Sequence, residues 1–246
     1  MSKKAASRMR VFAGPNGSGK STIIKEIQKI VKTGTYINAD DIEKASREKR
    51  FINLGDYNVE STPEAFRKYL ENSTLAAKAR QEGFNIGLSL SNNVITLTDE
   101  THSYEAALIS DYLRNLLLTK GETFSFETVM SHRSKLDMFK KAHEAGFKNY
   151  LYFISTESAD INVKRVELRV KKGGHPVNEE KIRERYVRSM ELVSEMIPFC
   201  HRCFILDNSL EINRLIVEIE DGKTVKILSD EIPAWVETYI LEKLGV

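Results

Sequence analysis

The chain has 246 residues, enough for one large domain or two small ones with a substantial buried core. Hydrophobic residues make up 41% and charged residues 29%, which excludes an intrinsically disordered chain. The 37 basic residues nearly balance the 35 acidic ones, which gives a net charge of +2. This small charge argues against nucleic acid as the partner, and it means that any anion-binding site must come from a local cluster of basic residues.

No run of about 18 apolar residues occurs, so we expect no membrane partner. The first ten residues are mostly basic and polar and lead directly into Val11-Phe12-Ala13. A secretory signal would need an apolar stretch of roughly 7–15 residues in this region. We therefore expect a cytoplasmic location.

Strands and helices alternate along the chain, which predicts an α/β fold with a mainly parallel sheet flanked by helices. The predicted strands cover residues 10–13, 35–39, 123–127, 150–154 and 203–207. A helix over 20–31 follows from the isoleucine and valine spacing, and Asp221-Gly222 between residues 215–220 and 224–228 predicts a hairpin before a final helix near Pro233.

Capping residues predict the bounds of the other helices. Thr62-Pro63 begins a helix that Gly83 ends, and Ser131 caps another that ends before Gly146. Residues 57–104 fit the alternation least well, and we interpret them as an insertion. Without repeats or linkers, the chain is predicted to form a single domain over 1–246, with this insertion and a lid at about 157–190.

The strongest motif is a phosphate-binding loop of the pattern G-x-x-x-x-G-K-[ST]. It is preceded by a strand and followed by a helix, as the motif requires. The glycines let the backbone N–H groups face a phosphate, Lys20 reaches the β- and γ-phosphates, and Ser21 offers a hydroxyl to Mg²⁺. The predicted ATP-binding residues are Gly14, Pro15, Asn16, Gly17, Ser18, Gly19, Lys20, Ser21 and Thr22.

Carboxylates at the ends of the strands are the candidates for chemistry, because ligands bind there in open α/β sheets. Asp40 ends the second predicted strand and Glu127 ends the third. Asp40 can accept the proton of a substrate hydroxyl, or it can only cap the following helix. Asp99-Glu100 resembles the acids of a hydrolytic ATPase, but its threonine-containing context favours an exposed strand or turn.

Residues 164–188 hold nine basic and four acidic residues. Arg165 and Arg169 share one helical face, Gly173-Gly174 breaks the helix, and Asn178 can cap the next helix, which carries Arg185. Two such helices could close over a triphosphate and stabilise the transferring phosphoryl group, or they could be a solvated charged pair.

Cys200 and Cys203 form a C-x-x-C spacing, with His201 and Arg202 between them. Because no second ligand pair exists elsewhere in the sequence, we interpret them as reduced thiols at the start of a buried strand rather than as a metal or redox site.

Five motifs in this order resemble the zeta-toxin family of P-loop kinases. They are GPNGSGKST at 14–22, NADDI at 38–42, FETVMS at 126–131, RVELRVKKGGH at 165–175 and IRERY at 182–186. The resemblance implies a three-layer P-loop kinase fold with an arginine-bearing lid, and phosphoryl transfer from ATP with Mg²⁺ to a sugar hydroxyl. The family's known acceptor is UDP-N-acetylglucosamine, a nucleotide-sugar, and its members are held inactive by an antitoxin.

The resemblance also implies roles for individual residues. Asp40 matches the catalytic base, and Glu127 with Thr128 lies where the family binds its acceptor. Arg169, with Arg165 or Arg185, would supply the lid arginines. The interval from Asp40 to Glu127 is longer than in the toxins, which is expected to reshape the acceptor pocket.

Two further functions stay open at this point. The chain could be an ATP-gated binding protein of a toxin–antitoxin-like system without small-molecule kinase activity, and the insertion would then bind the partner. It could also phosphorylate polynucleotide 5′ ends, which its near-neutral charge disfavours.

Overall fold

The computed structural model describes residues 6–97 and 103–246. The chain divides into two compact units, the first formed by Met1–Thr33 and Glu127–Val246 and the second by Gly34–Phe126. The sequence predicts one domain with an insertion at 57–104, and all of the described part of that insertion lies in the second unit. Within the described residues, no helix is long and apolar enough to cross a membrane.

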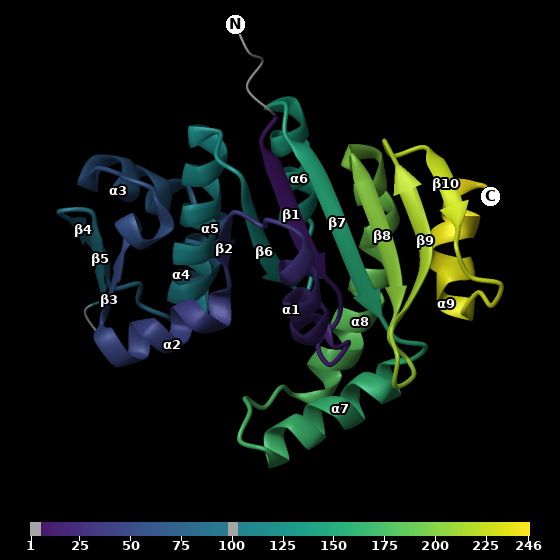
Figure 1. Cartoon of the computed structure of the whole chain (residues 1–246). Helices are drawn as coiled ribbons and strands as arrows, with labels where there is room; N and C mark the ends of the chain where they lie inside the picture. Colours follow the sequence, from purple (N-terminus) through teal and green to yellow (C-terminus); the bar gives the residue numbers. More distant parts are fainter. Residues whose placement is uncertain (1–5, 98–102) are drawn as a thin grey trace, which may run out of the picture. The chain divides into compact units, whose positions relative to one another are not determined.

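The first unit is built on a mixed sheet in which β1, β7 and β8 run parallel and β9 and β10 are added antiparallel (Figure 1). Val11 pairs with Leu151, and Leu151 pairs with Cys203. The strands are β1 (Arg8–Ala13), β7 (Lys148–Ser155), β8 (Arg202–Asp207), β9 (Arg214–Glu220) and β10 (Thr224–Ile227). The predicted C-terminal hairpin is confirmed, with Asp221 and Gly222 both at positive φ.

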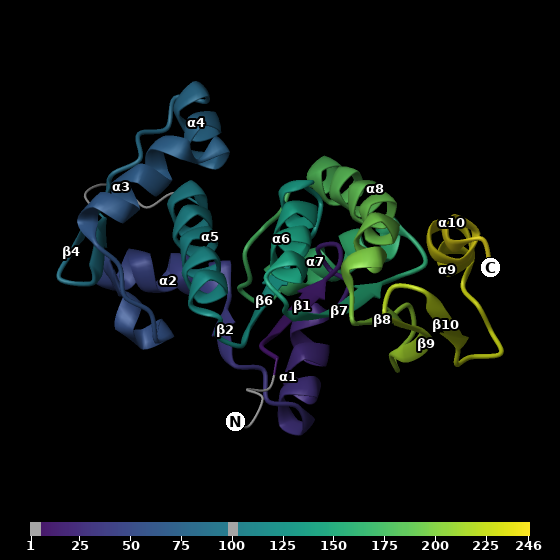
Figure 2. The same cartoon turned by 90° about the horizontal axis from the view of Figure 1, so that it is seen from above.

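Helices lie on both faces of this sheet, with α6 and α8 on one side and α1 on the other (Figure 2). The helical elements are α1 (Lys20–Ile30), α6 (Ser134–Glu144), α7 (Ala159–Lys171), α8 (Glu179–Met196), η2 (Ile197–Phe199), α9 (Ala234–Val236), the π-helical η3 (Glu237–Leu241) and α10 (Glu242–Leu244). The predicted α/β fold with a mainly parallel sheet flanked by helices is confirmed.

The core of the first unit comes from the nearly continuous apolar runs of its parallel strands, as expected when helices cover both faces. Val11, Phe12 and Phe153 are fully buried. Phe153 faces Trp235 of α9 at a ring-centroid distance of 6.1 Å. This packing fixes the carboxyl ends of β1 and β7, from which the candidate site is built.

The second unit pairs β2 with β6 in parallel and carries a small antiparallel sheet of order β3-β5-β4. The strands are β2 (Thr35–Ile37), β3 (Phe51–Asn53), β4 (Leu88–Ser91), β5 (Val94–Leu97) and β6 (Phe124–Thr128), whose last two residues belong to the first unit. The helical elements are α2 (Ala39–Lys49), η1 (Leu54–Tyr57), α3 (Pro63–Asn72), α4 (Thr74–Gln81) and α5 (Ser103–Lys120).

Two predicted helix bounds are wrong. The helix expected from Thr62 to Gly83 is two helices, because Ser73 is extended and its hydroxyl accepts a hydrogen bond from the Ala76 N–H to begin α4. The helix expected from Ser131 begins at Ser134, after a turn in which the His132 ring accepts from the Ser134 N–H. Local side-chain bonds of this kind compete with helix continuation.

The segment around Asp99-Glu100 is only partly described. Val94–Leu97 forms the central strand of the small sheet, with Thr96 exposed but Ile95 and Leu97 buried, so this strand is not exposed as a whole. Asp99 and Glu100 themselves lie outside the described residues.

Cys200 and Cys203 are both free and buried, at the start of β8 as predicted. Burial and the neighbouring Cys203 raise the pKa of the Cys200 thiol, which disfavours the reactive thiolate. The described residues contain no cluster of three or more His, Cys, Asp or Glu side chains that could hold a metal.

The cap of α2 tests the two interpretations of Asp40. Asn38, not Asp40, is the N-cap: its Oδ1 accepts from the Asp40 N–H at 2.9 Å. The interpretation of Asp40 as the capping side chain is therefore wrong.

We predict that Asn38→Ala lowers the free energy of unfolding by about 1 kcal/mol, because the cap is lost. Asp40→Asn should change it by less than about 0.5 kcal/mol. Urea unfolding followed by circular dichroism measures both. A larger loss for Asp40→Asn than for Asn38→Ala would contradict the assignment of the cap.

Candidate active site

The phosphate-binding loop connects the carboxyl end of β1 to the first turn of α1. Gly14 N–H donates to the Thr128 carbonyl at 3.3 Å, which joins the start of the loop to the end of β6. Gly19 occupies the N-cap position of α1 with a left-handed backbone, and no side chain caps the helix. An uncapped helix N-terminus leaves N–H groups and positive potential for an anion.

Lys20 lies buried against the loop and its ammonium group bonds to the loop backbone. Its Nζ donates to the Gly14 carbonyl at 2.8 Å and to the Pro15 carbonyl at 2.9 Å. The side chain is 7% exposed. Because these carbonyls orient the ammonium group next to the loop N–H groups, it is held where a phosphate chain entering the loop would meet it.

Gly17 shows how closely the loop approaches α7. Its φ is +81°, and a Cβ atom built there would lie 2.5 Å from the Asn162 carbonyl oxygen. The first turns of α7 therefore pack directly on the loop. Only glycine combines this backbone conformation with this approach.

Ser21 and Thr22 are exposed in the first turn of α1, directly after Lys20. A serine hydroxyl is a hard oxygen ligand of the kind that Mg²⁺ accepts beside phosphate oxygens and water. The exposed Ser21 hydroxyl therefore fits the metal role predicted for it.

Two predicted acceptor-binding residues lie beside the loop at the end of β6. The Glu127 carboxylate is 4.0 Å from the Lys20 ammonium group. Thr128 uses its hydroxyl to accept from the Met130 N–H at 3.0 Å, and its carbonyl accepts from Gly14. Thr128 thus shapes the backbone, whereas Glu127 brings a negative charge to the lysine.

Helices α7 and α8 form one packed pair. Val163, Val166 and Ile182 make a small apolar cluster between them. Arg183 of α8 also contacts Asp160 of α7 at 2.7 Å, and its hydrogen bonds to Asp160 and Glu179 raise its pKa. Asn178 caps α8 as predicted, accepting from the Lys181 N–H at 3.2 Å.

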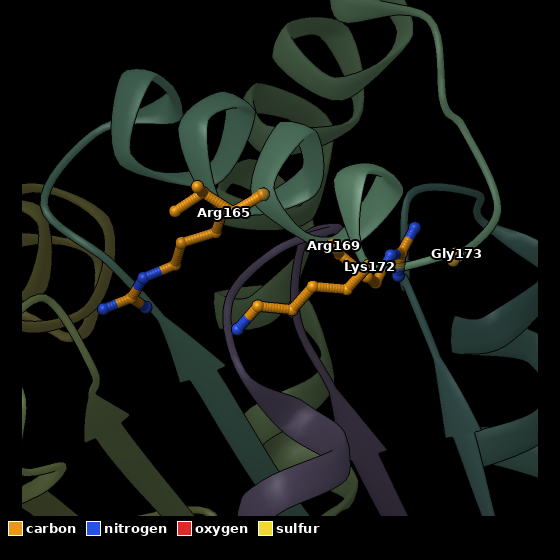
Figure 3. Close-up of a pocket in the computed structure, with 6 residues that line it drawn as sticks. Arg165, Arg169, Lys172 and Gly173 are labelled. Atoms are coloured by element: carbon orange, nitrogen blue, oxygen red, sulfur yellow. The ribbon is translucent and has the colours of Figure 1, made fainter.

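The three predicted lid arginines have different partners. Arg185 reaches the loop, where its Nη1 donates to the Asn16 side chain at 3.4 Å. Arg165 instead donates to the Asn208 carbonyl at 2.7 Å, and Arg169 donates to the His175 carbonyl at 2.9 Å. Figure 3 shows the Arg165 and Arg169 side chains directed away from one another.

An open pocket of about 470 Å³ lies along α7 between these two arginines (Figure 3). Its lining includes Leu168, which is 56% exposed, and Lys172 at the end of the helix. The pocket combines the positive charge of Arg165, Arg169 and Lys172 with the apolar surface of Leu168.

Asp40 belongs to the second unit, at the second position of α2. Its side chain is exposed, as is that of its neighbour Asp41. The structure therefore brings together, within the first unit, the loop, Lys20, Glu127, Thr128 and Arg185. The role of Asp40 stays a prediction.

Sequence reasoning missed Asn162 and Asn208, which touch the loop from α7 and from the segment after β8. The Asn208 side chain donates to the Ser18 carbonyl at 2.8 Å. The signal that could have found it is its place directly after a predicted parallel strand, where ligand-binding residues of α/β proteins gather.

Comparison with known proteins establishes the fold. No family model matches the chain. An uncharacterized protein of Haemophilus influenzae is 36% identical over 63 residues, which are 26% of this chain and 45% of that protein. The chain thus spans less than half the length of this curated relative.

Among solved structures, the complex AvrRxo1-ORF1:-ORF2 with ATP superposes with a TM-score of 0.51 at 14% identity, covering 99% of this chain and 64% of that one. The same complex with sulphate ions gives 0.51 at 13% identity, covering 99% and 65%. The PezAT toxin–antitoxin system of Streptococcus pneumoniae gives 0.45 at 14% identity, covering 85% and 72%. The first two similarities show a shared α/β fold.

We predict that Gly17→Ala destabilises the first unit by more than its backbone strain alone. A left-handed alanine costs about 1–2 kcal/mol, and the contact with Asn162 adds about 1–3 kcal/mol. Gly146→Ala is the matched control, because Gly146 has a φ of +77° and nothing within 4 Å of the added Cβ. Thermal unfolding of both variants measures the difference, and equal losses would show that the loop does not pack on α7 as described.

Proposed function

We propose that this chain is an ATP-dependent phosphotransferase acting on a hydroxyl group of a small molecule. The observation that carries the proposal is the loop itself, with an uncapped helix N-terminus and the Lys20 ammonium group bonded to two loop carbonyls at 2.8 and 2.9 Å. This combination is suited to a nucleoside triphosphate. The crystal structure of AvrRxo1-ORF1:-ORF2 with ATP, a protein of the same fold, supports ATP as the donor.

In the proposed reaction, the acceptor oxygen forms a bond to the γ-phosphorus while the bond from that phosphorus to the β–γ bridging oxygen breaks. Lys20 and Arg185 stabilise the charge on the transferring group, and Asp40 takes the proton of the acceptor hydroxyl. The leaving group is ADP. Ser21 would help to hold Mg²⁺, which would supply positive charge to the phosphates when bound.

We further propose a nucleotide-sugar such as UDP-N-acetylglucosamine as the acceptor. The support is the match of FETVMS at 126–131 to the zeta-toxin motif, together with the position of Glu127 beside Lys20. A carboxylate can accept hydrogen bonds from sugar hydroxyls. A partner of the antitoxin kind belongs to the same proposal and is supported by the pairing of ORF1 with ORF2 in AvrRxo1.

The first test is transfer of label from γ-labelled ATP with Mg²⁺ to a panel of acceptors led by UDP-N-acetylglucosamine, with products resolved by mass. We expect Lys20→Ala to lose both ATP binding and transfer. Asp40→Asn should keep ATP binding but slow transfer by about 100-fold or more, because a general base is lost. Asp41→Asn is the control, since it removes a neighbouring charge that is also exposed and should leave transfer unchanged.

Normal transfer by Asp40→Asn would show that another group is the base. If the wild type binds ATP but labels nothing, even in a whole metabolite extract, the chain is an ATP-gated binding protein rather than a kinase.

Arg185 gives a second prediction. Because it is the lid arginine that reaches the loop, Arg185→Ala should slow transfer by about 100-fold, with little change in thermal stability. Arg188→Ala is the control, since Arg188 lies on the same helix and contacts Glu184 at 2.6 Å. Equal rates in the two variants would exclude Arg185 from the reaction.

A further inference from the structure

Asn208 lies at a junction between the loop, the lid and the parallel strands of the first unit. It follows the last residue of β8, and its backbone N–H donates to the Ser155 carbonyl at the end of β7 at 2.8 Å. Its backbone is therefore fixed to the strand next to β1. The side chain is only partly exposed.

The Asn208 side chain determines how one peptide group of the loop is turned. Its Nδ2 donates to the Ser18 carbonyl at 2.8 Å. All described peptide bonds are trans, so the Ser18 carbonyl and the Gly19 N–H point in opposite directions. Holding this carbonyl on Asn208 directs the Gly19 N–H to the opposite side of the peptide.

The approach between the loop and Asn208 is close enough to be selective. A Cβ atom added to Gly19 would lie 2.1 Å from Asn208 Nδ2, and the φ of Gly19 is +90°. The Asn208 side chain can therefore occupy this position only because residue 19 has no side chain. A longer side chain at position 208 would meet the same backbone.

The backbone of Asn208 also contacts α7, the first helix of the predicted lid. The Asn208 carbonyl accepts from Arg165 of α7 at 2.7 Å, and the next two carbonyls accept from the same guanidinium group at 3.3 and 3.4 Å. Arg165 therefore connects α7 to residues 208–210, the segment whose Asn208 side chain contacts the loop.

Asp207, the residue before Asn208, is buried and makes several contacts that hold this segment. Asp207 is 1% exposed and accepts from the Ser209 hydroxyl at 2.6 Å and from the Trp235 indole N–H at 3.0 Å. Arg214 places a positive charge 3.5 Å from the same carboxylate. These contacts hold the residues next to Asn208 in place.

We infer that Asn208 is a positioning residue that sets the loop conformation required to bind the phosphate chain of a nucleotide. The inference rests on the proposed function only in one respect, namely that the ligand of the loop is a nucleotide. Its effect passes through the Ser18 carbonyl, and no contact of Asn208 with the reacting atoms is required. Loss of the amide donor lets this peptide rotate, so that the loop no longer presents all of its N–H groups to the phosphates.

The test compares Asn208→Ala and Asn208→Asp with the wild type. The aspartate keeps the size of the side chain but replaces the donor with an acceptor that repels the Ser18 carbonyl. Asn149→Ala is the matched control, because Asn149 is a buried asparagine of the first unit whose Nδ2 also donates to backbone carbonyls, those of Phe139 and Phe199, both at 2.9 Å. Thermal unfolding identifies a temperature at which all four proteins are folded.

Affinity is then measured at that temperature with a fluorescent ATP analogue and Mg²⁺, and by competition with inorganic tripolyphosphate. We expect both Asn208 variants to bind the analogue and the tripolyphosphate about tenfold or more weakly than the wild type. Asn149→Ala should lower thermal stability but leave both affinities within about twofold.

Unchanged affinity in both folded Asn208 variants would overturn the inference while leaving the proposed function intact. Equal weakening by Asn149→Ala would also overturn it, because the effect would then follow general stability. A wild type that bound ATP without phosphorylating any acceptor would contradict the proposed kinase activity alone. A wild type that bound no triphosphate would overturn both proposals.

Discussion

The candidate site depends on the burial of one ammonium group beside a tightly turned backbone. A buried lysine is costly unless its charge is compensated, and Lys20 is compensated by two loop carbonyls and by the Glu127 carboxylate at 4.0 Å. These partners hold the lysine at the start of α1. The loop must curl to supply them, and this curl requires the close contacts with Asn162 and Asn208.

The placement of α7 follows from the same constraint. Since α7 packs on Gly17 and is joined to the segment after β8 through Arg165, its first half is a fixed wall of the site. The open pocket between Arg165 and Arg169 continues past the end of the helix to Lys172 and the two glycines. The arginines that looked alike in the sequence therefore do different things: Arg165 joins elements, Arg169 bonds to the loop after its own helix, and Arg185 reaches the phosphate-binding loop.

The second unit adds a separate compact body to this arrangement. Its small antiparallel sheet and the helices α3, α4 and α5 have their own core, in which Phe66, Leu108 and Leu113 are buried. The Tyr69 hydroxyl donates to the Leu108 carbonyl at 3.0 Å and so joins α3 to α5.

The sequence by itself determined the phosphate-binding loop, because glycine, lysine and serine at fixed spacing are a local backbone requirement. It also determined the alternation of strands and helices and the caps at Thr62 and Asn178, which depend on residues a few positions apart. It could not place Ser73 as a helix break or choose Asn38 over Asp40 as a cap, since several neighbouring residues could make the same local bond. Only the tertiary structure separated the three arginines and brought Asn208 to Ser18, 190 residues away, because those contacts are set by which strand ends meet in the folded sheet.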